Sequence, residues 1–133
     1  MILDTSAIIA VITGEDDAEY YLFQMYNAPE LFISAATLTE TLIVASAKDH
    51  LSGGEQFYAT SALNLIQDLK VSVVPFTEDM THIALKAWLR FGKGSHQANL
   101  SFGDCLSYAA AQVTGLPLLY KGNDFSLTDI SRA

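Results

Sequence analysis

Four acidic side chains in this chain stand where hydrolytic chemistry is often done: Asp4, Glu40, Asp104 and Asp124. Asp4 directly follows the apolar residues 1–3, which we expect to form a buried strand, and ligands of parallel α/β sheets bind at the carboxyl ends of strands. Four carboxylates packed together raise one another's pKa values, a cost that a hard divalent cation such as Mg²⁺ or Mn²⁺ removes. Such a cation lowers the pKa of a bound water and neutralises a phosphoryl group under in-line attack. The acidic set therefore favours metal-dependent hydrolysis of phosphodiester bonds.

Three of these acids also have a purely structural interpretation. Asp4 is a good N-cap for a following helix, and Asp104 stands three residues after Ser101, as in a capping box. Asp124 ends the turn-forming sequence at residues 121–124. Capping or a turn therefore remains open for each of them when it is taken alone.

Glu40 is harder to explain as a structural residue. Its expected helix, residues 35–49, carries apolar or small residues all round it, which predicts a buried helix. No basic residue lies within one turn of Glu40 on this helix, and an unpaired buried carboxylate costs several kcal/mol or becomes protonated. An ion pair with another element is the structural alternative to a role in chemistry.

Strands and helices alternate along the sequence, as judged from apolar periodicity and from Gly and Pro breaks. We expect strands at residues 1–4, 31–33, 71–74 and 118–120, and helices at about 5–12, 15–27, 35–49, 54–69, 78–91 and 102–114. Such alternation is typical of a layered α/β fold with parallel strand pairing. A length of 133 residues predicts a single domain spanning 1–133. The tail after residue 124 has no clear pattern.

The charge balance is acidic, with a formal net charge of −8 from 15 acidic and 7 basic residues. Taken alone, this argues against a nucleic-acid binder, because phosphate contacts need basic patches. A metal bound by the acidic set would offset part of the charge. Lys86, Arg90 and Lys93 also stand at i, i+4 and i+7, which predicts one helix face. That face either contacts an RNA backbone or is simply solvated.

Several classes of protein and site are disfavoured by the sequence. No apolar run reaches the roughly 18 residues needed to span a bilayer, and the first residues, which are expected to form a strand, show no basic region of a signal peptide. The single cysteine, Cys105, excludes an intramolecular disulfide and is expected to pack as a small hydrophobe. His50, His82 and His96 lack metal-ligand spacing. We therefore expect a cytoplasmic protein without a membrane segment.

The sequence resembles PIN-domain ribonucleases, specifically the VapC toxins of bacterial type II toxin–antitoxin systems. The match runs in order from the first residue nearly to the last. Its segments are Met1-Ile2-Leu3-Asp4-Thr5-Ser6-Ala7, Thr39-Glu40, Arg90-Phe91-Gly92-Lys93-Gly94, Leu100-Ser101-Phe102-Gly103-Asp104-Cys105, residues 114–125 and Thr128-Asp129-Ile130. The order and spacing of these segments together carry the resemblance.

This resemblance implies a three-layer PIN-like domain with a parallel sheet and the activity of a magnesium-dependent endoribonuclease. It maps a metal-binding and catalytic quartet onto Asp4, Glu40, Asp104 and Asp124, with the first and third as the most direct metal ligands. Asn123 stands where the family varies between Asp and Asn, and it can orient water or bind the metal weakly. The resemblance further implies a cognate antitoxin that occludes the site, and frequent homodimerisation.

Other residues near the expected site have less specific roles. Thr5 and Ser6 either bind a phosphate or a metal-bound water at a helix N-terminus, or only cap that helix. The aromatic-rich helix at 15–27 is expected to supply core residues and part of an antitoxin or dimer surface.

Our interpretation is an RNA-hydrolysing toxin that uses Mg²⁺, with Mn²⁺ able to substitute, and a metal-bound water. The alternative is a degenerate, non-catalytic PIN module that binds a basic antitoxin segment. A phosphorelay receiver is disfavoured because residues 71–74, taken as the middle strand, are followed by Pro75 rather than an aspartate. A phosphatase is disfavoured because Asp4-Thr5-Ser6 lacks the Asp-x-Asp pattern.

Overall fold

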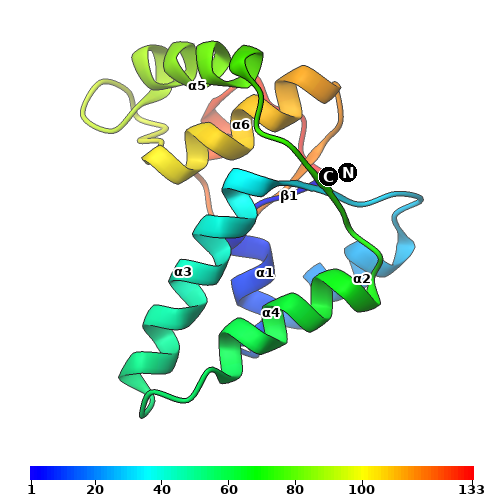
Figure 1. The fold of residues 1–133 in the computed structure, drawn as a ribbon. Coiled ribbons are helices and arrows are strands. Elements are labelled where there is room, and N and C mark those ends of the chain that lie inside the picture. Colours follow the sequence, from blue (N-terminus) through cyan, green and yellow to red (C-terminus); the bar gives the residue numbers. More distant parts are fainter.

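The computed structural model (Figure 1) describes residues 1–133. It contains one parallel four-stranded sheet in the order β3-β2-β1-β4. The strands are short: β1 (Ile2–Leu3), β2 (Phe32–Ser34), β3 (Ser72–Val74) and β4 (Leu118–Leu119). All three pairings are parallel. The expected α/β fold with a short-stranded parallel sheet is confirmed.

Six α-helices and a short 3₁₀ helix connect and cover the strands. They are α1 (Thr5–Ile12), α2 (Ala18–Asn27), α3 (Ala35–Leu51), α4 (Phe57–Asp68), α5 (Glu78–Phe91), α6 (Phe102–Thr114) and η1 (Phe125–Leu127). The predicted helices agree with these bounds to within a few residues. One detail is wrong: because α5 ends at Phe91, Lys93 lies in the following loop and does not share a helix face with Lys86 and Arg90.

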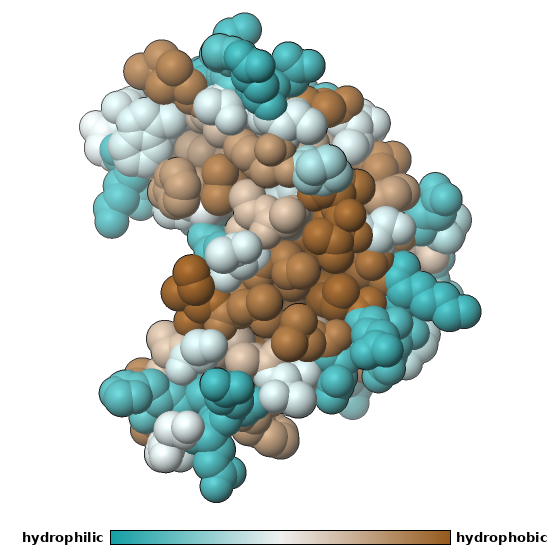
Figure 2. All heavy atoms as spheres, in the orientation of Figure 1, coloured by the Kyte–Doolittle hydropathy of each residue, from teal (hydrophilic) through white to brown (hydrophobic).

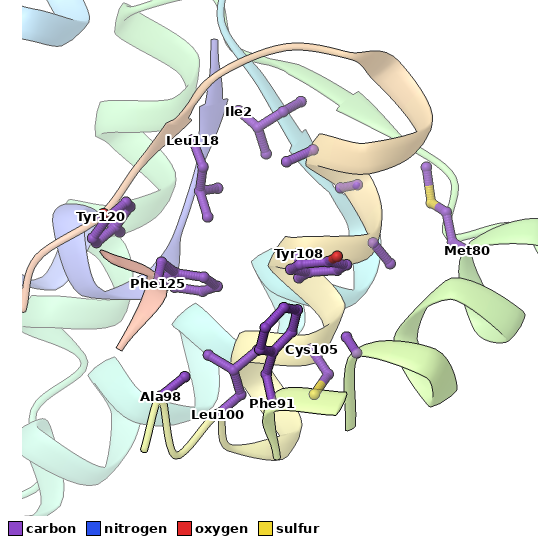
Figure 3. Close-up of a cluster of buried hydrophobic side chains, with 14 residues drawn as sticks. Ile2, Met80, Phe91, Ala98, Leu100, Cys105, Tyr108, Leu118, Tyr120 and Phe125 are labelled. Carbon is purple, nitrogen blue, oxygen red and sulfur yellow. The ribbon is translucent and has the colours of Figure 1, made fainter. Parts of the chain in front are cut away.

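Side chains on the two faces of the sheet enter two separate hydrophobic clusters. Consecutive residues of a strand point to opposite faces. Ile2 and Leu118 accordingly pack with α5 and α6 (Figure 3), whereas Leu3 and Leu119 pack with α1, α2 and α4. Helices thus cover both faces, as the predicted three-layer arrangement requires.

The position of β3 corrects one expectation. The sequence suggests residues 71–74 as the middle strand, but β3 pairs only with β2 and lies at the edge of the sheet. The central strands are β1 and β2, and β1 is the strand that ends at Asp4. The lack of an aspartate after residues 71–74 therefore does not speak against a phosphorelay receiver.

The strand order places a topological switch point beside β1. The chain moves outward from β1 to β2 to β3, then crosses through α5 and α6 and adds β4 on the other side of β1. Ligands of open α/β sheets bind at the carboxyl ends of the strands at such a point. The residues that follow β1 and β4 therefore border the expected crevice.

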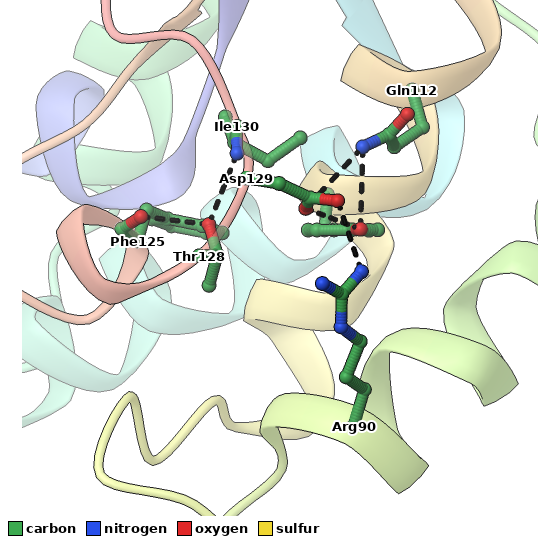
Figure 4. A network of polar contacts seen from close by, with 7 residues as sticks. Arg90, Gln112, Phe125, Thr128, Asp129 and Ile130 are labelled. Carbon is green, nitrogen blue, oxygen red and sulfur yellow. Dashed lines mark hydrogen bonds and ion pairs between the residues drawn. The ribbon is translucent and has the colours of Figure 1, made fainter.

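The tail that sequence patterns leave undefined lies along β4. The Leu118 N–H donates to the Ser131 carbonyl at 2.9 Å, and the Ala133 N–H donates to the Leu118 carbonyl at 3.0 Å. Asp129 fastens the tail to the helices: it accepts from the Tyr108 hydroxyl at 2.7 Å and pairs with Arg90 at 3.1 Å (Figure 4). None of the helices is both long and apolar enough to cross a bilayer.

Candidate active site

Asp4 is buried at the end of β1, with 3% of the residue exposed. One carboxylate oxygen accepts from the Ser6 N–H at 2.9 Å and the Ser6 hydroxyl at 2.5 Å. The other accepts from the Ser107 hydroxyl at 2.5 Å. Asp4 is thus the N-cap of α1, as the structural interpretation expects, and its carboxylate is held in one orientation from two sides.

Glu40 reaches the same region from α3. Ser34 caps this helix at the end of β2, since its side chain accepts from the Thr37 N–H at 3.0 Å. The Thr5 hydroxyl donates to Glu40 Oε1 at 2.5 Å. Burial raises the pKa of Glu40, the Thr5 hydrogen bond opposes that rise, and the negative charge of Asp4 adds to it. Glu40 has no ion-pair partner, so the structural alternative of a salt bridge is not realised.

The expectation that α3 is buried all round is wrong. Ile43, one turn after Glu40, is 64% exposed, and Ala35, Ser46 and Ala47 are exposed as well. Glu40 is half-buried at the boundary between the inner and outer faces of the helix.

Asp104 lies in the first turn of α6, inside a complete capping box. The Ser101 N–H donates to Asp104 Oδ2 at 2.9 Å, and the Asp104 N–H donates to Ser101 Oγ at 3.2 Å. Burial raises the pKa of Asp104 to about 6, against the effect of the Ser101 hydrogen bonds and with help from the charges of Asp4 and Asp124. The negative charge of Asp4 thus raises the pKa values of both Glu40 and Asp104.

Asp124 and Asn123 lie in the exposed turn between β4 and η1. The Asp124 side chain makes no capping hydrogen bond, although it is close enough for its charge to raise the pKa of Asp104. The Asn123 carbonyl accepts from the Ser126 N–H at 3.2 Å. Asp124 therefore lies at the rim of the acidic set, with Asn123 next to it in the chain.

Three of the four predicted acids, Asp4, Glu40 and Asp104, line one pocket of about 410 Å³. Its polar and charged lining residues are Asp4, Thr5, Ser6, Glu15, Glu40, Lys48, Asp104 and Lys121. As the side chains stand, no three acidic, histidine or cysteine residues approach closely enough to form a metal cage. Each carboxylate instead turns toward a protein donor.

The donor set still fits a magnesium ion. Mg²⁺ prefers oxygen ligands, keeps several waters and commonly takes only one or two carboxylates from the protein. Four carboxylates line the pocket, and three of them, those of Asp4, Glu40 and Asp104, have no basic partner, whereas Glu15 pairs with Lys121. Burial and the charge of Asp4 raise the pKa values of Glu40 and Asp104. A divalent cation would compensate the negative charges of these carboxylates.

The sequence did not identify two residues that hold this site together, Ser107 and Lys121. Ser107 lies on α6 and orients Asp4, while the Lys121 N–H donates to Ser6 Oγ at 2.9 Å. The Lys121 ammonium also pairs with Glu15 and with Asp17, the latter at 2.7 Å. Lys121 thereby fastens the chain after β4 to the turn between α1 and α2.

The basic residues predicted to contact RNA lie outside the acidic pocket. Arg90 pairs with Asp129, Lys86 is exposed on α5, and Lys93 is exposed in the loop after that helix. None of the three lines the acidic pocket, whereas Lys48 and Lys121 do. Contact of Lys86, Arg90 and Lys93 with RNA stays a prediction.

An apolar groove of about 800 Å³ borders the acidic pocket and shares Glu40 with it. It lies between α3, α5 and α6, on the side where the outline in Figure 2 is hollowed, and exposes Ile43, Leu85, Trp88 and Phe102. Cys105 lines its floor and is buried, as expected.

The aromatic helix α2 divides between core and surface, as its composition predicts. Tyr21 and Met25 are buried, whereas Tyr20, Phe23 and Tyr26 are exposed. The molecule thus carries a second exposed apolar surface on α2.

Comparison with known proteins identifies the family. Residues 1–130 match the family model of the PIN domain. Ribonuclease VapC28 of Mycobacterium tuberculosis is 42% identical over 134 aligned positions, which cover 100% of this chain and 97% of that protein. Ribonuclease VapC of Mycolicibacterium smegmatis is 39% identical over 132 positions, which cover 98% of each chain.

Solved structures show the same fold. The crystal structure of Mycobacterium tuberculosis VapC20, described as a sarcin-ricin loop cleaving toxin, superposes with a TM-score of 0.75 at 20% identity and covers 99% of this chain and 97% of that one. A toxin–antitoxin complex from Klebsiella pneumoniae matches with a TM-score of 0.67 at 19% identity and covers 96% of this chain and 92% of that one. The sequence relatives, the family model and the fold agree, and this chain belongs to the PIN-domain family, in its VapC branch.

Proposed function

We propose that this protein is a magnesium-dependent endoribonuclease and the toxin of a toxin–antitoxin pair. The observation that carries the proposal is the pocket at the carboxyl end of β1, where Asp4, Glu40 and Asp104 line one cavity with raised pKa values for two of them. Curated relatives that match nearly the whole chain are named as VapC ribonucleases, which supports the same activity.

Asp4 and Asp104 would hold the metal, with Glu40 and Asp124 completing the acidic set. When bound, Mg²⁺ supplies positive charge that lowers the pKa of a water ligand and stabilises charge on a phosphoryl group. Ser6 and Ser107 fix the direction of the Asp4 carboxylate, and Thr5 fixes that of Glu40. These hydroxyl donors keep the acidic oxygens in place before substrate arrives.

Glu40 is the candidate to take up a proton from the attacking water. A general base works best when its pKa is close to the working pH, and burial moves the pKa of Glu40 in that direction. In-line attack of water on the phosphorus would release a 5′-phosphate and a 3′-hydroxyl.

Lys48 is the basic side chain best placed to contact the RNA backbone beside the scissile bond, because it lines the acidic pocket and has no ion-pair partner, whereas the Lys121 ammonium pairs with Glu15 and Asp17. A cation there offsets the repulsion between phosphates and the acidic rim. Asn123, in the exposed turn next to Asp124, is placed to orient water at the same rim.

The partner proposals are a cognate antitoxin and a second copy of this chain. The Klebsiella structure is a toxin–antitoxin complex, and its matching chain shares the fold. Two exposed apolar surfaces support the need for partners: the groove lined by Ile43 and Trp88, and the outer face of α2 with Phe23 and Tyr26. Apolar patches of this kind typically mark protein interfaces.

A cleavage assay tests the proposed function. Purified antitoxin-free protein is incubated with a mixed RNA pool in Mg²⁺ or in EDTA, and new 5′ ends are mapped by ligation that requires a 5′-phosphate. Cleavage in Mg²⁺ that EDTA abolishes supports the nuclease. Absence of cleavage, together with tight binding of a basic antitoxin segment, would favour the non-catalytic PIN module.

A further inference from the structure

The Glu40 carboxylate lies directly against Gly103, the residue that precedes Asp104. A Cβ atom built on Gly103 would come within 1.4 Å of Glu40 Oε2 and 2.3 Å of Glu40 Cδ. These separations are far below any van der Waals contact, so the Glu40 carboxylate occupies the space that a side chain at position 103 would need.

Gly103 is not needed here for its backbone freedom. It lies inside α6 and is not among the glycines with positive φ, so any residue could adopt its backbone conformation. A helical glycine is normally unfavourable compared with alanine. What the structure uses is therefore the absence of a side chain.

Glu40 is confined on its other side by a hydrogen bond. The Thr5 hydroxyl donates to Oε1 at 2.5 Å, and Thr5 Oγ1 itself lies 2.9 Å from Thr41 Oγ1. The carboxylate is thus held between a fixed donor on α1 and the gap over Gly103 on α6. Gly103 is buried, so no solvent separates the two.

We propose that Gly103 is a positioning residue for Glu40: its missing side chain provides the space in which the Glu40 carboxylate joins Asp4 and Asp104 in the acidic pocket. The proposal rests on the proposed function for its catalytic consequence. Because the clash falls on the flexible end of Glu40 and not on backbone, a methyl group at position 103 displaces the carboxylate and leaves the fold intact.

The test compares Gly103→Ala, Glu40→Asp and the double variant Gly103→Ala/Glu40→Asp. Aspartate is one methylene shorter, so its carboxylate can withdraw from the added methyl group. We expect Gly103→Ala to slow RNA cleavage at least tenfold and to weaken Mg²⁺ binding, measured by calorimetry, several-fold. The melting temperature of the metal-free protein should stay the same or rise.

The double variant distinguishes a specific clash between residues 103 and 40 from a general structural defect. Its loss of cleavage should be smaller than the product of the two single losses, because the shorter aspartate avoids the clash that the methyl group at position 103 makes with glutamate. A crystal structure of metal-free Gly103→Ala should show the hydrogen bond from Thr5 to Glu40 broken. Wild-type cleavage, wild-type Mg²⁺ affinity or loss of folding in Gly103→Ala would each overturn the proposal.

The two proposals fail in distinguishable ways. If wild-type protein neither binds Mg²⁺ nor cuts RNA, the proposed function is wrong. The crystal structure of Gly103→Ala then still decides whether Gly103 places Glu40, because that measurement needs neither metal nor substrate.

Discussion

Asp4 and Asp104 each cap a helix and line the acidic pocket with the same carboxylate. Asp4 accepts from the Ser6 N–H at the start of α1, and Asp104 accepts from the Ser101 N–H at the start of α6. Helix N-termini attract negative charge, so these positions hold a carboxylate in a fixed direction. Capping and chemistry, which the sequence presents as alternatives, are therefore compatible at both residues.

Replacing Asp104 with asparagine should stabilise the metal-free protein at neutral pH. Folding raises the pKa of Asp104 to about 6, so its charge costs free energy above that pH. The cost is absent below about pH 3, where the carboxyl is protonated in the folded state and largely so in the unfolded state, and it grows between there and about pH 6. We expect Asp104→Asn to gain roughly 1–2 kcal/mol at pH 7.5, allowing for solvent screening of a partly exposed side chain, and almost nothing near pH 3.

Urea denaturation in EDTA at the two pH values measures this gain. Asparagine can still accept from the Ser101 N–H through its carbonyl oxygen, so the capping box is largely preserved. Asp68→Asn, which removes the same charge from an exposed site, is the matched control. Equal stability of Asp104→Asn and wild type at pH 7.5 would contradict the cost assigned to the Asp104 charge.

The sequence predicts the acidic residues of the site but not the residues that hydrogen-bond to Asp4 and Ser6. Asp4, Asp104 and Asp124 were identifiable because each stands at a recognisable strand end, helix start or turn, and Glu40 because it is an acid in a largely apolar helix with no basic residue nearby. Ser107 lies 103 residues from Asp4, and Lys121 lies 115 residues from Ser6. No local pattern pairs residues so far apart, since only the packing of α6 and β4 beside β1 brings them together.

The first turn of α6 contains both a helix cap, Ser101, and a residue of the acidic pocket, Asp104. The effect of losing a cap on stability can therefore be separated from its effect on the pocket by comparing Ser101 with a cap elsewhere. Ser101→Ala removes the side-chain oxygen that accepts from the Asp104 N–H, which should cost about 1 kcal/mol of stability. The backbone N–H of residue 101 still donates to the Asp104 carboxylate, but the turn that carries Asp104 is less firmly held. Thr77→Ala removes the equivalent cap from α5, whose Thr77 side chain accepts from the Met80 N–H at 3.3 Å. Thr77 does not line the acidic pocket.

We therefore expect similar losses of stability in the two variants, but a several-fold slower RNA cleavage only in Ser101→Ala. Urea denaturation and initial cleavage rates provide the two readouts. Equal cleavage by both variants would mean that the capping box does not orient Asp104 for activity.

Most element boundaries could be predicted because Gly, Pro and capping residues interrupt clear apolar segments. Ser101 and Asp104 form the expected capping box, Ser34 caps α3, and Gly115 ends α6 in the left-handed conformation. Two features were not predictable in this way. The edge position of β3 depends on the direction of the crossover that follows it. The outer face of α3 is apolar yet exposed, and in sequence an exposed apolar face looks the same as a buried one.

At the scale of the whole molecule, the sheet topology gathers the site from four separate segments. Asp4 follows β1, the turn with Asp124 follows β4, and these strands are neighbours. Glu40 lies on α3, which follows β2. Asp104 lies on α6, which packs on the opposite face of the sheet from α1 and α4. The acidic pocket therefore forms only when both layers pack on the sheet, which couples its integrity to the global fold.

Magnesium should consequently stabilise the folded protein. A ligand that binds only the folded state adds about 2.7 kcal/mol when its concentration is 100 times Kd. We expect the melting temperature of the wild type to rise by several degrees in Mg²⁺ relative to NaCl of equal ionic strength. Asp4→Asn should lose most of this rise. The same rise in the variant would place the bound magnesium elsewhere.

The most direct test of the account is the Mg²⁺-dependent cleavage rate of one susceptible RNA by wild type, Asp104→Asn and the exposed control Asp68→Asn. We predict that Asp104→Asn loses at least a hundredfold in rate while remaining folded, and that Asp68→Asn cuts at the wild-type rate. Full activity in Asp104→Asn would contradict the assignment of the acidic pocket as the site of RNA hydrolysis.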